Sequence, residues 1–173
     1  GCTSCSLSSN TIRGFKDDSS AAGVSLGASS ATLMNNIYFN SSQGLVLTNV
    51  IGNFISGDYF KGSHTTSISF DGASNSTLAN VTINGTNGNA FLITAATLGK
   101  KSLNNTIVNL SVLDTQSGSY DISFVASKVN QTTFVDSNIS SISGGTHAGR
   151  ISVKNSSSGE IVFLRYVNGT TTT

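Results

Sequence analysis

The feature that most constrains the fold of this chain is a pattern of short apolar segments that returns at an almost constant interval. In one series an apolar residue is followed two positions later by Asn or Asp, and the intervals between its anchors are 18, 27, 29, 27 and 27 residues. The anchors are Leu33, Ile51, Leu78, Ile107, Phe134 and Ile161, the last with Phe163 in place of Asn. A second series of alternating segments runs beside it, through Val24, Leu45, Ile68, Phe91, Ile122 and Ile151. The pattern indicates a six-unit internal repeat.

Each unit contains two or three short strands separated by turn clusters such as DGASNS and QSGS, and no unit shows the period of an amphipathic helix. A period in the twenties built from strands predicts a β-solenoid of about six coils. A single coil has no core of its own, so the coils must stack, with apolar columns inside and parallel strands bonded between coils. The alternative fold is an antiparallel jelly roll, as in donor-strand pilin-like subunits, which irregular strand spacing would favour.

The segments outside the repeat predict three parts of the chain. The solenoid spans residues 24–168, a Ser-rich N-terminal arm spans 1–23, and a Thr-rich tail spans 169–173. The arm contains Cys2 and Cys5 as C-x-x-C, without the helix of a redox unit or the further ligands of a zinc site. We expect a disulfide, either between these two cysteines or to a neighbouring subunit.

The recurring Asn or Asp is expected at the bend between two strands of a coil. Asn tolerates the left-handed backbone of a tight bend, and its amide can bond to the same position in the next coil. Stacked amides of this kind also stabilise cross-β assemblies. The predicted ladder consists of Asn35, Asn53, Asn80, Asn109 and Asp136. The alternative is that these residues end strands in unrelated turns.

The polarity of the chain comes from Ser, Thr and Asn, because only 10% of its residues are charged. Ten Asn-x-Ser/Thr sequons are present, whereas 18 Asn and 51 Ser plus Thr among 173 residues would give about 5 by chance. Sequons are glycan acceptors only in secreted proteins, so their excess favours a secreted glycoprotein over the alternative that composition alone creates them. The candidate acceptors are Asn40, Asn75, Asn80, Asn84, Asn104, Asn109, Asn130, Asn138, Asn155 and Asn168.

Charge and hydropathy exclude two classes of partner. The net charge is +1 and no basic stripe is present, so we expect no nucleic acid as a partner. No apolar run reaches the roughly 18 residues needed to cross a bilayer, so we predict no membrane span. The start of the chain has no signal-peptide core, which fits a mature secreted chain.

On its periodicity and its Asn columns, the chain resembles the right-handed parallel β-helix proteins of the pectate-lyase-like superfamily over residues 24–168. The resemblance implies a right-handed helix of parallel strands. Within that group, the Ser/Thr/Asn-rich, sequon-dense sequence looks most like archaeal secreted surface proteins that build sheaths, surface layers or extracellular fibres.

The same superfamily contains polysaccharide lyases, which use clustered carboxylates for calcium, and hydrolases, which use paired acids. The segment GGTHAGRISVK resembles the Gly-His-Gly and Arg-Ile-Lys elements of polygalacturonase-like enzymes through His147, Arg150 and Lys154, although here the elements are adjacent instead of about one coil apart. His64 is expected in an exposed loop. The acids are scattered, at Asp17, Asp18, Asp58, Asp71, Asp114, Asp121, Asp136 and Glu160. We therefore predict no catalytic residue, no metal site and no cofactor.

The ends of a solenoid suggest a function. Each end has an unpaired strand edge, and this chain has no Pro, no helix pattern and few charges in the last coil to cover it. Head-to-tail stacking does not close and yields a fibre. The first hypothesis is therefore a structural subunit of an extracellular filament, sheath or surface layer, with its own copies and covalent glycans as partners. The alternatives are a carbohydrate-binding or adhesin module and, third, a polysaccharide lyase or hydrolase; the tyrosines available as platforms are Tyr38, Tyr59, Tyr120 and Tyr166.

Overall fold

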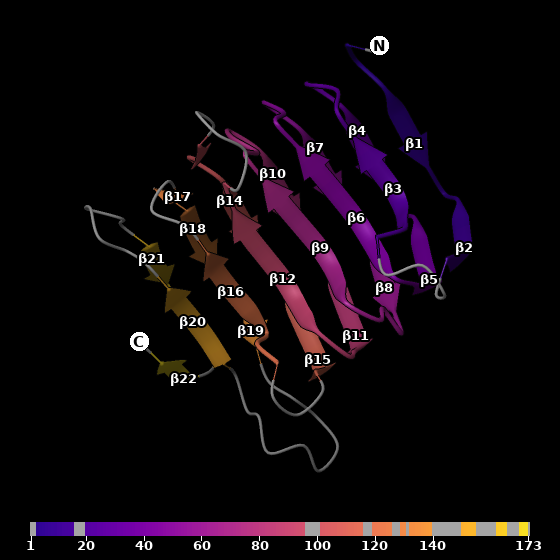
Figure 1. Cartoon of the computed structure of the whole chain (residues 1–173). Helices are drawn as coiled ribbons and strands as arrows, with labels where there is room; N and C mark the ends of the chain where they lie inside the picture. Colours follow the sequence, from indigo (N-terminus) through magenta and orange to yellow (C-terminus); the bar gives the residue numbers. More distant parts are fainter. Residues whose placement is uncertain are drawn as a thin grey trace.

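The protein is an all-β parallel β-solenoid, seen in a computed structural model (Figure 1). The structure describes residues 3–15, 20–95, 101–115, 119–125, 129–130, 132–139, 150–154, 162–165 and 170–172. Over these ranges every assigned element is a strand, and none is a helix that could cross a membrane. Every strand pairing is parallel, which confirms the predicted solenoid and rules out the antiparallel jelly roll.

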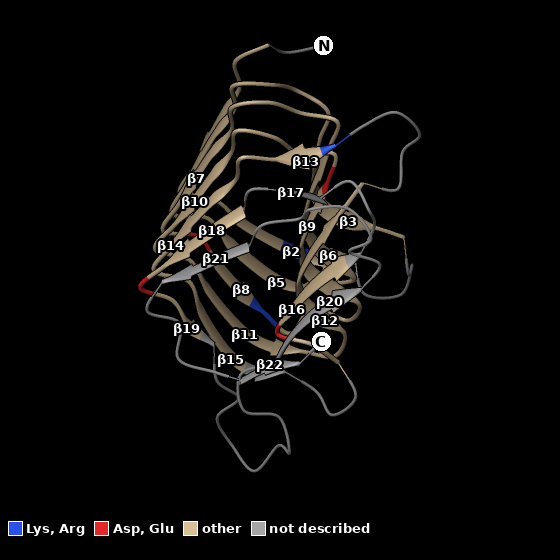
Figure 2. Cartoon of the chain, turned by 90° about the vertical axis from the view of Figure 1, so that its left-hand side faces the viewer, with Lys and Arg blue, Asp and Glu red and all other residues tan. Residues whose placement is uncertain are grey.

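Three sheets form the sides of the coil, and each strand pairs with the strand one coil away (Figures 1 and 2). Sheet A contains β1 (Ser6–Ser8), β4 (Thr32–Met34), β7 (Phe54–Ser56), β10 (Thr77–Ala79), β14 (Thr106–Val108), β18 (Thr132–Val135) and β21 (Val162–Arg165). Sheet B contains β2 (Thr11–Phe15), β5 (Ile37–Ser41), β8 (Tyr59–Lys61), β11 (Thr82–Thr86), β15 (Ser111–Thr115) and β19 (Asn138–Ile139). Sheet C contains β3 (Ala22–Leu26), β6 (Gln43–Thr48), β9 (Thr66–Asp71), β12 (Asn89–Thr94), β16 (Ile122–Val125), β20 (Arg150–Lys154) and β22 (Thr170–Thr172). A small pair, β13 (Ser102–Leu103) and β17 (Val129–Asn130), lies apart from these sheets.

The register of sheet C matches the second sequence series at every position. Val24, Leu45, Ile68, Phe91, Ile122 and Ile151 are consecutive register partners. Leu26, Leu47, Phe70, Ile93, Phe124 and Val153 form a parallel column two residues further on. Alternation in these strands therefore predicted the register, because two inward positions per strand are apolar in almost every coil.

The register of sheet A corrects two anchors of the first series. Leu33 pairs with Ile55, which is fully buried, whereas Ile51 is 55% exposed. At the far end, Phe134 pairs with Leu164 rather than Ile161. The correct column runs through Leu7, Leu33, Ile55, Leu78, Ile107, Phe134 and Leu164, so its intervals vary from 22 to 30 residues. The segment Ile51-Gly52-Asn53 has the spacing of the motif, but it lies four residues before the true anchor Ile55.

The predicted arm and tail are also wrong where the structure describes them. Residues 3–15 form part of the first coil, because β1 pairs with β4 and β2 pairs with β5. The alternation Ser6-Leu7-Ser8 is a strand too short to stand out among so many serines. Thr170–Thr172 pairs with Arg150–Ser152 and so belongs to sheet C. Cys5 is disulfide-bonded, and Cys2, the other cysteine of the chain, lies outside the described residues.

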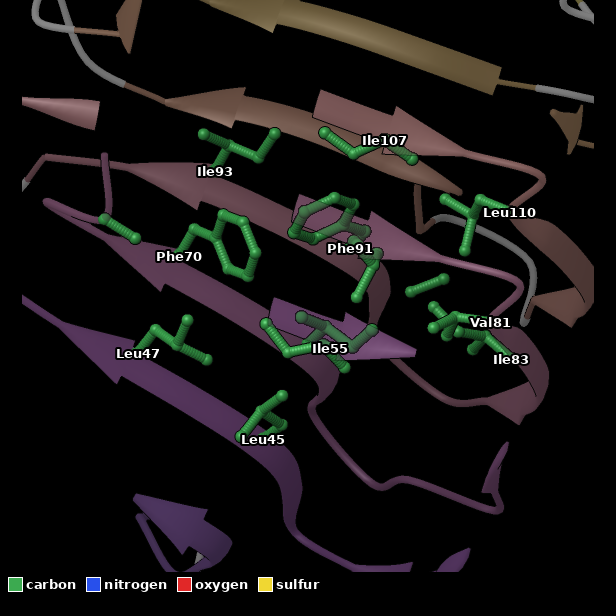
Figure 3. Packing of buried hydrophobic residues seen from close by; sticks show 14 of the residues in the cluster. Leu45, Leu47, Ile55, Phe70, Val81, Ile83, Phe91, Ile93, Ile107 and Leu110 are labelled. Atoms are coloured by element: carbon green, nitrogen blue, oxygen red, sulfur yellow. The ribbon is translucent and has the colours of Figure 1, made fainter. Parts of the chain in front are cut away.

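The core is a set of apolar columns enclosed by the three sheets (Figure 3). Aromatic rings stack between coils: Tyr38 lies 4.3 Å from Phe60 in parallel, and Phe70 meets Phe91 edge-on at 4.9 Å between centroids. Each fully buried side chain of this size contributes roughly 1.5–3 kcal/mol relative to exposure. Many outward positions in the same strands are Ser, Thr, Ala or Asn. The inward columns therefore account for the apolar residues of the chain, and the outward positions account for much of its Ser, Thr and Asn.

Candidate functional site

Four corner columns hold every residue with positive φ among the described residues. Each column follows from the strand registers, and its φ values lie between 49° and 87°. The columns are Ser30, Gly52, Asn75 and Asn104; Ser9, Asn35, Gly57, Asn80, Asn109 and Asp136; Gly14, Asn40, Gly62 and Gly85; and Asn49 with Gly72. The main-chain N–H of a corner residue donates to a carbonyl of the next coil, as Asn80 N does to Val108 O at 3.0 Å. Gly and Asn recur there because they tolerate this backbone.

Four of the five predicted ladder residues share one corner column, with Gly57 in the coil between Asn35 and Asn80. Asn109 Nδ2 donates to Asn80 Oδ1 at 2.9 Å, on the exposed surface. The side chain of Asn35 lies where a Cβ on Gly57 would stand, which explains why that coil carries glycine.

Asn53 does not belong to this ladder. It is 2% exposed and precedes a strand of sheet A, so it faces the interior. Its Oδ1 accepts the Ala31 N–H at 2.9 Å, and its own N–H donates to Ser76 Oγ at 3.2 Å. The Ser76 N–H in turn donates to Asn105 Oδ1 at 3.0 Å. A buried column of amides and a hydroxyl therefore satisfies main-chain groups that the strands leave unpaired.

A second buried polar stack crosses the first coils. Asn10 N donates to Asn36 Oδ1 at 3.0 Å, Asn36 N donates to Asp58 Oδ1 at 2.8 Å, and Tyr38 Oη donates to Asp58 Oδ2 at 3.1 Å. Burial raises the pKa of Asp58, while the bonds from Asn36 and Tyr38 lower it in part. Burial also raises the pKa of Tyr38. Asp58 and Tyr38 are each 1% exposed, so this carboxyl supports the coil rather than facing a substrate.

The corner columns account for half of the sequons. Asn40, Asn75, Asn80, Asn104 and Asn109 are corner residues with positive φ, and each is exposed. After four of them comes an inward residue and then the Ser or Thr that begins the next strand, as in Asn75-Ser76-Thr77. Without these five, five sequons remain among 13 Asn, close to the 13 × 51/173, or about 4, expected by chance. The fold therefore produces the excess through its turn chemistry.

The acids of the described residues do not gather into a site. Of those with described side chains, Asp58 and Asp121 are buried and Asp71 and Asp136 are not, and no two of them are register partners. Within the described residues no group of three His, Cys, Asp or Glu could hold a metal. Figure 2 shows how sparse charges are along the described ribbon.

The polygalacturonase-like elements are only partly described. Arg150 and Lys154 begin and end β20, whereas His147 lies outside the described residues. His64 is exposed, with its Nδ1 3.4 Å from Asn87 Nδ2.

The first coil leaves its inward residues partly uncovered. Leu7, Ile12, Val24 and Leu26 are half-buried and pack on the core from one side. Their register partners one coil further on are at most 1% exposed: Leu33, Tyr38, Leu45 and Leu47. Among the described strands, β1, β2 and β3 pair on one edge only.

The outer face of sheet B carries an aromatic and cationic patch, formed by Arg13, Phe39, Tyr59, Lys61 and Asn84. Arg13, Phe39 and Lys61 are consecutive register partners, with the guanidinium carbon 5.1 Å and the Lys61 nitrogen 5.9 Å from the Phe39 ring centroid. Asn84 Nδ2 donates to Tyr59 Oη at 3.3 Å beside them. Both cations are exposed, and the two rings are partly exposed. This arrangement is suited to stacking on a flat ligand and attracting negative charge.

Comparison with solved structures supports the fold class. The chain is similar to an alginate lyase from Paenibacillus sp. str. FPU-7, with 16% identity and a TM-score of 0.62 over 91% of this chain and 55% of that one. It is also similar to the periplasmic alginate epimerase AlgG, with 14% identity and a TM-score of 0.60 over 97% of this chain and 39% of that one. No protein-family model and no curated protein matches the chain.

These similarities show that the chain shares the β-solenoid fold of these solved structures. The third structure, the Agl-KA catalytic domain, has 16% identity and a TM-score of 0.51 over 96% of this chain and 42% of that one. The chain spans about half or less of the length of these structures. At such low identity the likeness concerns the fold alone.

Proposed function

We propose that this protein is a secreted structural subunit of an extracellular filament, sheath or surface layer, of the kind found on archaeal cells, that assembles by stacking coil on coil. The observation that carries the proposal is the half-buried inward face of the first coil. A further coil placed on β1, β2 and β3 would cover Leu7, Ile12, Val24 and Leu26 as their counterparts are covered inside the solenoid.

The outermost strands at the other end of the solenoid continue three of these columns. Leu164 in β21, Ile139 in β19 and Thr171 in β22 continue the columns of Leu7, Ile12 and Val24 by register. A second copy could therefore add strands to all three sheets, meeting apolar positions in sheets A and B and a threonine in sheet C. Covering four half-exposed side chains contributes about 1 kcal/mol each, besides the strand hydrogen bonds. Such a contact joins unlike surfaces and does not close, so it builds a polymer.

The surface chemistry supports an extracellular location. Low charge and a Ser, Thr and Asn surface reduce long-range repulsion between copies, and a disulfide at Cys5 suits an oxidising compartment. Covalent glycans on exposed Asn side chains would keep the outer faces soluble.

Sedimentation and electron microscopy at increasing protein concentration test the proposal. The wild-type protein should form concentration-dependent polymers, and Leu7→Asp should suppress them because it places a charge in the stacking surface. Ser56→Asp is the matched control, since Ser56 faces outward in a central coil of the same sheet and lies in no sequon. A wild-type protein that stays monomeric at high concentration, or a Leu7→Asp variant that polymerises equally well, would contradict the proposal.

A second candidate function is a carbohydrate-binding or adhesin module, favoured by the patch on sheet B. Two of the structural neighbours are an alginate lyase and an alginate epimerase, so an acidic polysaccharide is the first ligand to test. Alginate should bind better than a neutral glucan, and Phe39→Ala or Lys61→Gln should weaken binding, whereas Lys101→Gln, an exposed lysine outside the patch, should not. Equal binding by all variants would exclude the patch. A fall in alginate viscosity would support the third alternative, a polysaccharide lyase or hydrolase.

A further inference from the structure

The corner asparagines share one orientation wherever a contact reveals it. Asn35 Oδ1 and Asn40 Oδ1 both lie over the corner glycine of the next coil, Gly57 and Gly62 respectively. Asn109 shows the opposite end of the amide, because its Nδ2 points back to Asn80 Oδ1 in the preceding coil. The carboxamide oxygen therefore points toward the C-terminal neighbour, and the nitrogen points toward the N-terminal neighbour.

This orientation makes the space around each amide nitrogen depend on the corner residue one coil earlier. That residue is a glycine for three sequons: Gly14 precedes Asn40, Gly52 precedes Asn75, and Gly57 precedes Asn80. For the other two corner sequons it is an asparagine, since Asn75 precedes Asn104 and Asn80 precedes Asn109. Glycine has no side chain to fill the space, whereas Asn fills it, and coils are only about 4.8 Å apart.

We propose that N-linked glycans attach at Asn40, Asn75 and Asn80, whereas Asn104 and Asn109 stay unmodified. The inference rests on the proposed secretion of the protein and specifies which of its sequons the fold leaves open. In the transfer, Nδ2 bonds to the anomeric carbon of a diphosphate-activated glycosyl donor. The bond from that carbon to the phosphate oxygen breaks, and one amide proton leaves with the diphosphate.

A hydrogen bond engages the amide nitrogen of two sequons, Asn84 and Asn109. Asn84 Nδ2 donates to Tyr59 Oη, and Asn109 Nδ2 donates to Asn80 Oδ1, so each nitrogen already has a partner. In contrast, Asn80 is bonded through its oxygen, which leaves its nitrogen facing Gly57. Asn109 has a second N–H that a glycan could replace, but a glycan there would crowd the Asn80 side chain one coil away, whereas a glycan on Asn80 leaves the ladder bond intact.

Site-by-site occupancy tests the inference. The whole chain is secreted from a eukaryotic cell line, and the folded fraction is digested and treated with a glycan-removing amidase in heavy-oxygen water, which marks each formerly glycosylated Asn as labelled Asp. Asn40, Asn75 and Asn80 should carry the label, and Asn104 and Asn109 should lack it. The variant Asn80→Gly should move occupancy to Asn109, because it gives Asn109 a glycine neighbour in a corner that accepts glycine.

The matched control is Asn75→Gly, which should open Asn104 and leave Asn109 unmodified. Wild-type molecules labelled at both Asn80 and Asn109 would overturn the inference, as would an Asn80→Gly variant in which Asn109 stays bare. A folded, secreted chain without label at any corner would overturn it too. None of these results bears on polymer formation, which is the separate test of the proposed function.

Discussion

Two neighbouring asparagines offer the sharpest test of the interior described above. Asn104 is an exposed corner residue with φ 54°, whereas Asn105 is fully buried in the column that also contains Asn53. Asn105 Oδ1 accepts the Ser76 N–H at 3.0 Å, and Asn105 Nδ2 donates to the Ala73 carbonyl at 2.8 Å. The substitution Asn105→Ala would leave both main-chain groups without these partners inside the solenoid.

The expected cost follows from these two bonds. An unsatisfied buried donor or acceptor costs about 1–3 kcal/mol, so the variant should lose about 2–6 kcal/mol of unfolding free energy. For a protein of this size each kcal/mol shifts the melting temperature by about 2–4 °C, which gives a decrease on the order of 5–20 °C. The melting temperature of Asn105→Ser should lie between those of the wild type and Asn105→Ala. A serine can accept such a bond, because Ser76 in the same column already accepts the Asn53 N–H at 3.2 Å.

The matched control is Asn104→Gly, one residue earlier. Its side chain has no buried partner and glycine accepts the left-handed corner, so the change should stay within about 0.5 kcal/mol. Thermal and urea unfolding followed by circular dichroism measure both variants, and amide hydrogen exchange shows whether the coil around Asn105 opens locally, as stacked coils allow. Equal melting of Asn105→Ala and Asn104→Gly would refute the role of the buried amide column.

Three further predictions concern two glycines, Gly57 at a corner and Gly88, and the buried acid Asp58. Gly57→Ala should cost about 1–2 kcal/mol of unfolding free energy for the left-handed backbone alone, and the added Cβ would also clash with the Asn35 side chain. In urea unfolding, a second change Asn35→Gly should restore the stability lost to the clash but not that lost to the backbone. Full restoration would show that the backbone conformation costs nothing. Gly88→Ala should destabilise the protein more than Gly57→Ala, because its Cβ would meet the main-chain carbonyl of Thr65, which cannot rotate away; the reverse order of urea midpoints would argue against the packing. Burial raises the pKa of Asp58 above its ordinary value of 3.8, so the folded state binds this proton more tightly than the unfolded state. The unfolding free energy of the wild-type protein should therefore fall as pH rises from about 3.8 to the raised pKa of the folded state. Asp58→Asn should remove this pH dependence and unfold at an equal or higher urea concentration at neutral pH, and a variant that keeps the slope would show that another group causes it.

The alternation of sheet C was readable in the sequence because its strands are long and carry two inward apolar positions each. Val24, Leu45 and Ile68 are register partners at the positions that the pattern predicted. The strands of sheet A are short, mostly three residues with a single buried position, so one misplaced apolar residue is enough to mislead. Ile51 misled the prediction because it stands two residues before Asn53, whereas the true anchor Ile55 stands two residues before Gly57.

The functional candidates were less readable than the fold. The patch on sheet B combines Arg13, Phe39 and Lys61, which are more than twenty residues apart in the chain and become neighbours only through the register of three coils. The buried stack of Asn36, Asp58 and Tyr38 was missed for the same reason. The sequons were visible, but their origin in the corner columns was not, because φ cannot be read from an Asn-x-Thr motif.

The amino-acid sequence alone determined that this protein is a stack of parallel strands, because a repeat of this length, with alternating apolar residues and no helical period, has no other way to bury its columns. Only the tertiary structure decided which asparagines stand at corners and which lie inside. Coil length varies from 22 to 30 residues along the sheet A column, so the position of each Asn depends on which main-chain groups the adjacent coils present to it. Asn104 and Asn105 are chemically identical in the sequence, and the hydrogen bonds of the neighbouring coil give them opposite environments.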